Sequence, residues 1–253
     1  MKTLFITSYL DLYSKDENGN RIAHNFGDKN KILTNLKKYV KKYDNMLMVA
    51  SDEYNTDASD MYSKVIVDSF NMTLPFKNYT LLDCRNKNNV TELVKNADFI
   101  FLMGGHVPTQ NKFFNGINLK NLLKDFDGVV LGGSAGSMNC ADVVYCPPEL
   151  EGEGYDKNFE RFLPGLSLTK INIFPHYDVI ADVVLDGKKM IDYAIEDSEK
   201  IPVLILEDGS YFIQKGDDIK LYGKSYRLYK KETKVLCDDD QSVKIDENLS
   251  IVK

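Results

Sequence analysis

The sequence predicts an α/β fold in which a mostly parallel sheet is flanked by helices, because short β-branched apolar runs alternate with helical patterns. The runs that predict strands are Thr3–Thr7, Met46–Ala50, Thr80–Asp83, Phe99–Met103, Gly128–Leu131, Leu168–Phe174 and Val203–Leu206. After residue 206 the pattern changes to hairpin-like strands at 210–214, 219–222, 225–229 and 234–236. No linker or repeat separates this part. We therefore predict one domain over residues 1–253, with residues 210–253 as an antiparallel hairpin appendage on one sheet.

Helices are predicted where apolar residues recur at a spacing of three and four. Such stripes cover residues 32–43, 61–70, 119–126 and 190–195. Two polar, turn-rich stretches, residues 11–27 and 146–164, predict long solvated loops.

Composition excludes several classes of function. The net charge of −6 is spread over interspersed Lys, Asp and Glu, so no basic stripe points to a nucleic-acid partner. No segment approaches 18 apolar residues, so we expect no membrane span. Residues 1–8 have too short an apolar run for a signal peptide, and the four cysteines show no C-x-x-C spacing, so we expect a cytoplasmic protein with reduced thiols. With three histidines in the chain and none beside Cys140 or Cys146, we expect no metal and no organic cofactor.

The most informative segment runs from Gly128 to Met138 and reads GVVLGGSAGSM. It has the G-x-S-x-G pattern of a nucleophile elbow, in which a strand turns sharply into a helix and exposes the central serine, here Ser134. A phosphate-binding loop would need Lys followed by Ser or Thr at the helix start, and a dinucleotide fingerprint would need G-x-G-x-x-G; the segment offers neither.

A nucleophilic serine needs a base and an orienting acid. His176 ends an apolar strand, and the carboxyl ends of parallel strands share one edge of a sheet, so His176 is the predicted base. His24 lies in a polar loop, and His106 follows a glycine pair at another strand end. Glu207 closes the strand 203–206 and is the predicted acid, with Asp178 and Asp142 as the alternatives.

An oxyanion hole needs backbone N–H donors near the serine. The N–H of Ala135, directly after the serine, is one predicted donor. The glycine pair Gly104-Gly105 follows the neighbouring strand and offers the second without side-chain obstruction.

Taken together, these motifs resemble the aspartyl dipeptidase (peptidase E) and cyanophycinase family of serine peptidases. The resemblance rests on residues 101–110 (FLMGGHVPTQ), Gly133-Ser134-Ala-Gly136, His176 and Glu207-Asp208-Gly209, and covers roughly residues 1–214. It implies a flavodoxin-like fold akin to class I glutamine amidotransferases. It also implies Ser134 as nucleophile, His176 as base, Glu207 as orienting acid, and Gly104, Gly105 and Ala135 as the oxyanion hole. His106 and Gln110, in the same motif, are then expected to face the substrate.

The resemblance implies hydrolysis of short peptides through an acyl-enzyme. One departure is that residues 177–196 contain no arginine, whereas the aspartyl dipeptidases bind the substrate's aspartate with an arginine-rich segment after the histidine. The alternatives are a non-catalytic ligand-binding member of the same fold, a cyanophycinase-like isopeptidase or amidase, and an esterase with the same triad. A homodimer stays open, because the C-terminal hairpins could cover a sheet edge, which we favour, or form a dimer contact.

Overall fold

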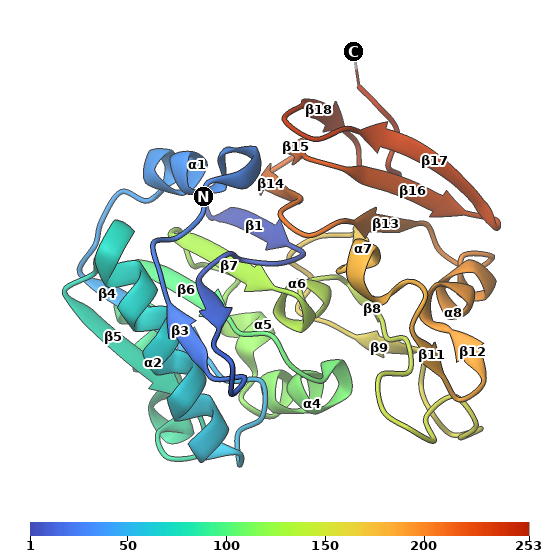
Figure 1. Ribbon diagram of the computed structural model, residues 1–253. Coiled ribbons are helices and arrows are strands. Elements are labelled where there is room, and N and C mark those ends of the chain that lie inside the picture. The colour runs from blue at the N-terminus through green and yellow to red at the C-terminus, as the bar shows by residue number, and fades with distance from the viewer. Residues whose placement is uncertain (253) are drawn as a thin grey trace.

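The computed structural model describes residues 1–252 and places the first half of the chain in a parallel sheet (Figure 1). Five strands pair in the order β1-β7-β6-β4-β5, and every pairing among them is parallel. Their bounds are Thr3–Thr7 (β1), Asn45–Val49 (β4), Asn78–Leu82 (β5), Phe99–Leu102 (β6) and Val129–Gly133 (β7). The structure is a mixed α/β fold with a large, mostly parallel central sheet, as the alternating pattern predicted.

The C-terminal strands are built into two sheets, which corrects the expected appendage on one sheet. Strands β14 (Tyr211–Lys215), β15 (Asp218–Tyr222) and β18 (Ser242–Ile245) continue the central sheet antiparallel beyond β1. A second sheet has the order β10-β13-β16-β17, with bounds Asn172–Phe174, Val203–Leu206, Ser225–Tyr229 and Glu232–Cys237. The predicted strands at 168–174 and 203–206 therefore lie outside the central sheet. One of their faces packs on α8 (Met190–Asp197), and the other joins the core of the central sheet.

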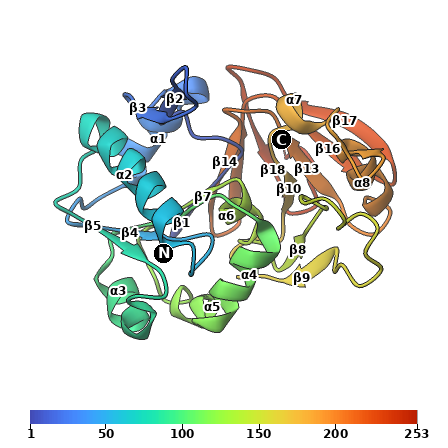
Figure 2. The ribbon, with the colours of Figure 1, turned by 60° about the horizontal axis from the view of Figure 1, so that its bottom comes forward.

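Helices cover both faces of the central sheet (Figure 2). On one face lie α1 (Ile32–Tyr39) and α2 (Thr56–Thr73), whose apolar side chains share a core with Phe5, Phe99 and Leu131. On the other lie α3 (Val90–Asn96), α4 (Val107–Gly116), α5 (Leu119–Leu122) and α6 (Ala135–Met138). Single-turn helix α7 (Tyr177–Ile180) follows β10, and 3-10 turns lie at Lys29–Lys31 and Lys87–Asn89.

Both predicted loops contain structure. Residues 11–27 hold the hairpin of β2 (Tyr13–Lys15) and β3 (Arg21–Ala23). Residues 146–164 end in β9 (Phe162–Pro164), which pairs with β8 (Val143–Tyr145), while β11 (Val184–Leu185) pairs with β12 (Lys188–Lys189). The expected solvated excursion is wrong at its start, because Pro147 and Pro148 are buried. In residues 1–252, no helix combines the length and apolarity needed to cross a bilayer.

Candidate active site

Ser134 lies at the sharp turn between β7 and α6. Its backbone has φ 50° and ψ −115°, a conformation that costs a non-glycine residue free energy and is found where a site requires it. The turn packs closely against β6 because Gly136 lacks a side chain: a Cβ there would lie 2.1 Å from the carbonyl oxygen of Leu102. The predicted nucleophile elbow is therefore present in the backbone.

The buried side chain of Ser137 hydrogen-bonds the elbow to the first strand. The Ser137 hydroxyl donates to the carbonyl oxygen of Thr7 (2.9 Å) and accepts from the Thr7 N–H (2.8 Å). The Ser134 N–H also donates to the Thr7 carbonyl, at 3.2 Å. These bonds hold the strained turn against the end of β1, and no sequence pattern singled out Ser137.

His176 reaches the serine from the end of β10. Its Nε2 lies 2.9 Å from the Ser134 Oγ, and its Nδ1 lies 2.7 Å from Oδ1 of Asp208. An ionised carboxylate only accepts hydrogen bonds, so the Nδ1 carries the proton and the Nε2 is free to accept from the serine hydroxyl. The structure thus brings together the predicted Ser134 and His176.

The acid beside His176 is Asp208, which corrects the expected contact with Glu207. The Glu207 Oε1 instead accepts a hydrogen bond from the Tyr226 hydroxyl at 2.6 Å, on the neighbouring strand β16. Successive side chains of an extended segment point in opposite directions, so the residue after the strand-end glutamate faces the histidine. The Asp-Gly turn that closes β13 supplies the residue that reaches the ring.

Three backbone and side-chain contacts fix Asp208 and His176 relative to each other. The Ser8 hydroxyl donates to Oδ1 of Asp208 (2.9 Å) and accepts from the His176 N–H (2.7 Å). The Asp208 N–H donates to the Asp178 carboxylate at 2.8 Å. Asp178 thus holds the backbone of Asp208 and does not contact the imidazole, while Asp142 is exposed beyond the end of α6.

Gly104 lies against Ser134, and Gly105 lies against Ser51. A Cβ on Gly104 would come within 3.4 Å of the Ser134 Cβ, and a Cβ on Gly105 would overlap the Ser51 side chain at 2.4 Å. Within residues 1–252, neither glycine N–H donates to a protein acceptor. Backbone donors therefore remain available beside the serine hydroxyl.

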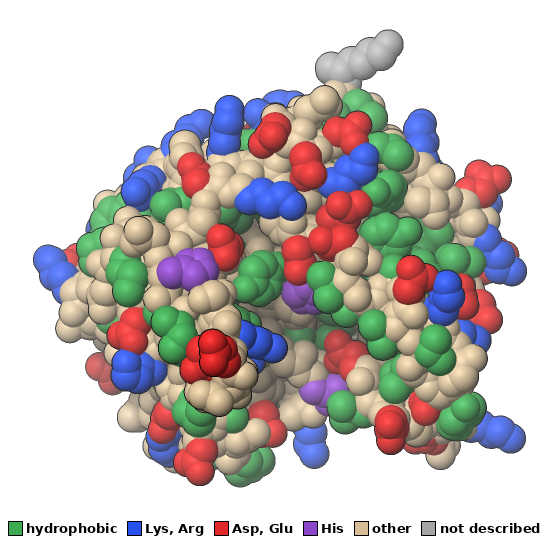
Figure 3. Space-filling view, in the orientation of Figure 1, with side chains coloured by type: hydrophobic (Ala, Val, Ile, Leu, Met, Phe, Trp, Pro, Cys, Tyr) green, Lys and Arg blue, Asp and Glu red, His purple; other side chains and the backbone are tan. Residues whose placement is uncertain are grey.

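A cavity of about 340 Å³ opens onto these residues. Its floor includes Gly104, Gly105, Ser134 and His176. Its walls come from the loop after β1, the β2–β3 hairpin, the loop after β4 and the first turns of α2, through Tyr9, Tyr13, Arg21, Asp52, Ser59 and Tyr62. Figure 3 shows this part of the surface as a hollow near the middle of the face, with histidine and acidic side chains around it.

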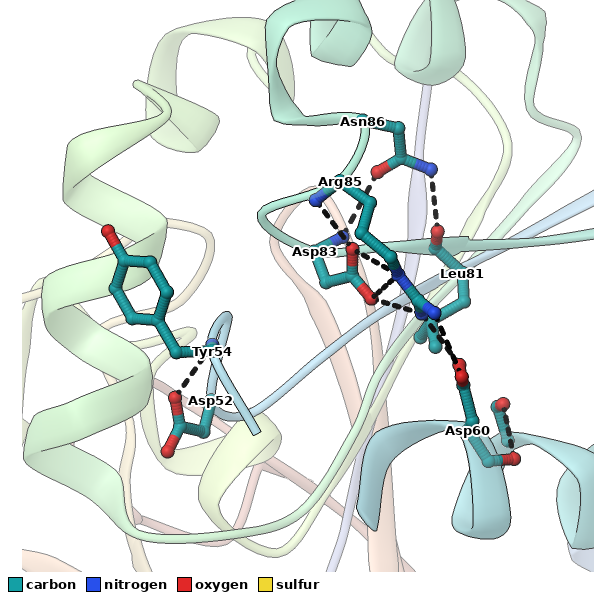
Figure 4. Close-up of polar contacts among 8 residues, drawn as sticks. Asp52, Tyr54, Asp60, Leu81, Asp83, Arg85 and Asn86 are labelled. Carbon is teal, nitrogen blue, oxygen red and sulfur yellow. Dashed lines mark hydrogen bonds and ion pairs between the residues drawn. The ribbon is translucent and has the colours of Figure 1, made fainter. Parts of the chain in front are cut away.

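The α2 wall of the cavity is held by an arginine that bridges two aspartates (Figure 4). Asp83, at the end of β5, is fully buried, and both its oxygens accept from the Arg85 Nε at 3.0–3.1 Å. The other end of the guanidinium donates to both oxygens of Asp60 on α2, at 2.6 and 2.8 Å. This bidentate contact fixes the helix that carries Tyr62.

His106 and Gln110 do not face the cavity, which corrects both expectations. The His106 Nε2 lies 2.9 Å from Oε1 of Glu153, and its Nδ1 lies 2.8 Å from the Thr109 hydroxyl. Gln110 is fully buried and donates to the carbonyl oxygen of Met103 at 2.6 Å. His106 is the N-cap residue of α4 and Gln110 lies in its first turn, so each contacts the surroundings of that helix instead of the cavity.

Glu149 is an ionisable group close to the site that the sequence did not single out. Its Oε2 accepts from the Val107 N–H at 2.9 Å, at the start of α4. Burial raises the pKa of the Glu149 carboxyl to about 7; nearby Glu153 adds to this rise, while the Val107 N–H and the nearby His176 ring oppose it. Glu149 and Glu153 therefore contact the start of α4, directly after the glycine pair, through Val107 and His106.

The described residues offer no metal centre: within 1–252, no group of three or more His, Cys, Asp or Glu side chains could hold an ion. Cys140 and Cys146 are both buried, and burial raises the pKa of each thiol.

The architecture and the site together define a mixed α/β protein with a strand-end serine, histidine and aspartate in hydrogen-bond contact. The model of peptidase family S51 matches residues 24–222, and the chain belongs to this family, which includes peptidase E. It is accordingly a peptidase, a class of hydrolases.

One similar solved structure is a crystal structure named "Putative Peptidase E Protein" from Listeria monocytogenes EGD-e. It superposes with a TM-score of 0.59 at 14% sequence identity, over 94% of this chain and 100% of the Listeria chain. At that identity the likeness concerns the fold. No curated protein matches the chain.

Proposed function

We propose that this protein is a serine peptidase of short peptides in which Ser134, His176 and Asp208 form the catalytic triad. The observation that carries the proposal is the continuous contact from the Ser134 Oγ through the imidazole to the Asp208 carboxylate, at 2.9 and 2.7 Å. This chain of contacts begins at a serine with a strained backbone that lines a cavity, which is where a nucleophile meets a substrate.

In the acylation step, the Ser134 Oγ attacks the carbonyl carbon of the peptide bond while the His176 Nε2 takes the hydroxyl proton. The resulting oxyanion accepts from the N–H of Ala135 and from the Gly104-Gly105 loop. The C–N bond then breaks, and His176 gives its proton to the leaving amine. Asp208 keeps the proton on the Nδ1 and stabilises the imidazolium.

In the deacylation step, water attacks the acyl carbon and His176 takes a proton from it. The ester bond to Ser134 breaks, and the histidine returns the proton to the serine oxygen. No group outside these residues, the peptide and water is needed to balance either step.

The size of the cavity supports short substrates. A volume of about 340 Å³ is near the lower end of ligand pockets, which fits one or two amino-acid residues better than a long chain. An exopeptidase acting on dipeptides or tripeptides is therefore the form of peptidase that we propose, and a cytoplasmic location remains part of the proposal.

A panel of dipeptides and tripeptides with varied terminal residues tests the proposal, with products identified by mass spectrometry. We expect wild type to cleave a subset of the panel and Ser134→Ala to cleave none. A non-catalytic ligand-binding protein would cleave no member of the panel. A Ser134→Ala variant that kept more than a few per cent of wild-type turnover would exclude the serine mechanism.

A further inference from the structure

Arg21 is a cation in the cavity whose hydrogen-bond donors are unused. It lies on β3, and its Cζ is 5.2 Å from the Tyr13 ring centre and 4.9 Å from the Tyr62 ring centre. Among residues 1–252 its guanidinium forms no ion pair and no hydrogen bond. Stacking on two rings fixes the plane of the guanidinium while its N–H groups stay free for a ligand.

The cavity connects Arg21 to the proposed nucleophile. Arg21, Ser134 and His176 all line it. Between them lies Tyr9, whose ring centre is 6.3 Å from the His176 ring and 6.3 Å from the Tyr13 ring. A ligand that reaches Ser134 therefore shares one open cavity with the guanidinium.

Contacts of the β2–β3 hairpin and of α2 position the two rings beside Arg21. Tyr62 lies on α2, which the Arg85 bridge to Asp60 ties to the end of β5. Tyr13 accepts a 3.4 Å contact from the Tyr9 hydroxyl at its carbonyl oxygen. The two rings that support Arg21 thus belong to different elements, and they pack edge to face against each other with their centres 6.0 Å apart.

One acidic side chain also lines the cavity. Asp52 follows β4, and its Oδ1 accepts from the Tyr54 N–H at 3.0 Å, as Figure 4 shows. Asp52 and Arg21 form no ion pair with each other among the described residues. The cavity therefore presents one unpaired cation and one anion, which complements a ligand with charges of both signs, as the end of a short peptide has.

We propose that Arg21 is a specificity-determining residue that binds a carboxylate of the substrate. The inference rests on the proposed peptidase function and names a feature of its substrates. The carboxylate has two sources, an acidic side chain or the free C-terminus, and a guanidinium recognises both by the same paired N–H···O bonds.

The test measures binding to Ser134→Ala, which cannot consume the ligand, by isothermal titration calorimetry. The probes are Asp-Ala, Asn-Ala and their two C-terminal amides, which remove each carboxylate separately and both together. Arg21→Gln in the same background removes the charge, and Arg21→Lys keeps the charge without the planar pair of donors. Lys15→Gln is the matched control, because Lys15 pairs with Arg21 across the hairpin and does not line the cavity.

We expect one carboxylate to matter. The peptide that carries it should bind at least tenfold more tightly than its amide, and Arg21→Gln should abolish that difference, while Lys15→Gln leaves it unchanged. Arg21→Lys should retain part of it. Loss of preference for Asp over Asn identifies the side chain as the source, and loss of preference for the acid over the C-terminal amide identifies the C-terminus.

The proposal is overturned if Arg21→Gln weakens all four peptides equally, if Lys15→Gln has the same effect, or if no probe binds. None of these results bears on Ser134, because hydrolysis of the wider panel by wild type tests the peptidase function separately. A wild type that cleaves neutral, amidated peptides as well as acidic ones would retain the peptidase proposal and exclude this one.

Discussion

Two sets of hydroxyl, imidazole and carboxylate groups in hydrogen-bond contact occur among the described residues. They contain the same functional groups but differ in backbone conformation and in access to the cavity. The His176 set joins Ser134, His176 and Asp208, and the His106 set joins Thr109, His106 and Glu153. Each histidine lies within 2.9 Å of both of its partners. Hydrogen-bond geometry alone would nominate both as triads.

Their surroundings separate them. Ser134 sits in a strained turn at a strand end and lines the cavity with His176. Thr109 lies within the first turn of α4, three residues from its own histidine, and is not part of the cavity wall. The hydroxyl contacts Nε2 in the His176 set and Nδ1 in the His106 set. A nucleophile therefore requires a hydroxyl presented to a ligand as well as a paired imidazole.

The largest difference between the sets is expected at the hydroxyls. Ser134→Ala should lower turnover by at least 10⁴-fold, since loss of one member of a triad disables the others. Its melting temperature should stay within a few degrees, because alanine fits the same turn. Kinetics of Ser134→Ala, His176→Gln and the double variant check this: the double variant should be no worse than either single one, and multiplicative losses would contradict the shared role.

The acids give the second contrast. Asp208→Asn should lower kcat by about 10²–10⁴, because an amide can hold the ring in the wrong tautomer and cannot stabilise an imidazolium. The upper end of that range is the loss of turnover that the same Asp-to-Asn change causes in a serine protease triad. Glu207→Gln should stay within tenfold of wild type, because its amide oxygen can still accept from the Tyr226 hydroxyl. A larger loss for Glu207→Gln than for Asp208→Asn would restore Glu207 as the orienting acid.

A third contrast is the pH dependence of stability near the His106 set. It comes from Glu149, which lies in the same segment as Glu153. The pKa of Glu149 is raised from its ordinary value of 4.5 to about 7 in the folded protein, so between these values the unfolded chain loses the proton and the folded protein keeps it. Stability therefore falls as pH rises through this window, by about 2 kcal/mol from this group between pH 5 and 7.5. Glu149→Gln cannot titrate, and its amide oxygen can still accept from Val107.

Urea unfolding of wild type and Glu149→Gln at pH 5 and pH 7.5 measures this effect. Other groups titrate in both proteins, so their contributions cancel in the difference. The variant should lose less stability than wild type between the two pH values. Equal losses would show that Glu149 ionises freely in the folded protein.

The smallest effect is expected in the His106 set. Thr109→Val removes the hydroxyl with little change in volume and should cost about 1 kcal/mol of stability, the value of one hydrogen bond. Turnover should stay within threefold of wild type. A hundredfold loss of turnover in this variant would give the His106 set a part in catalysis and remove the distinction between the two sets.

Much of this architecture could be predicted from the sequence because it depends on local patterns. The glycines around Ser134 and the apolar run before it signal a strand and a sharp turn, and His176 and Gly104 each follow a recognisable strand. Residues that act through long-range contacts carried no such signal: Ser8 bonds to the N–H of His176, and Ser137 bonds to the backbone of Thr7, each more than 100 residues away along the chain.

The errors have a common physical origin. Glu207 and Asp208 are adjacent, and only the direction of the side chain at the end of β13 decides which one meets His176. His106 and Gln110 follow the glycine pair, but α4 begins at Val107 and turns both away from the cavity. Side-chain direction at element ends depends on tertiary packing, which a pattern of residue types does not specify.

The most direct test of the central claim is covalent labelling with a fluorophosphonate, followed by peptide mapping. We expect one adduct per chain, on Ser134, formed by wild type and by Thr109→Val at similar rates and lost in His176→Gln. An adduct on Thr109, or labelling of Ser134 at an unchanged rate in His176→Gln, would contradict the claim that only the His176 set activates a nucleophile.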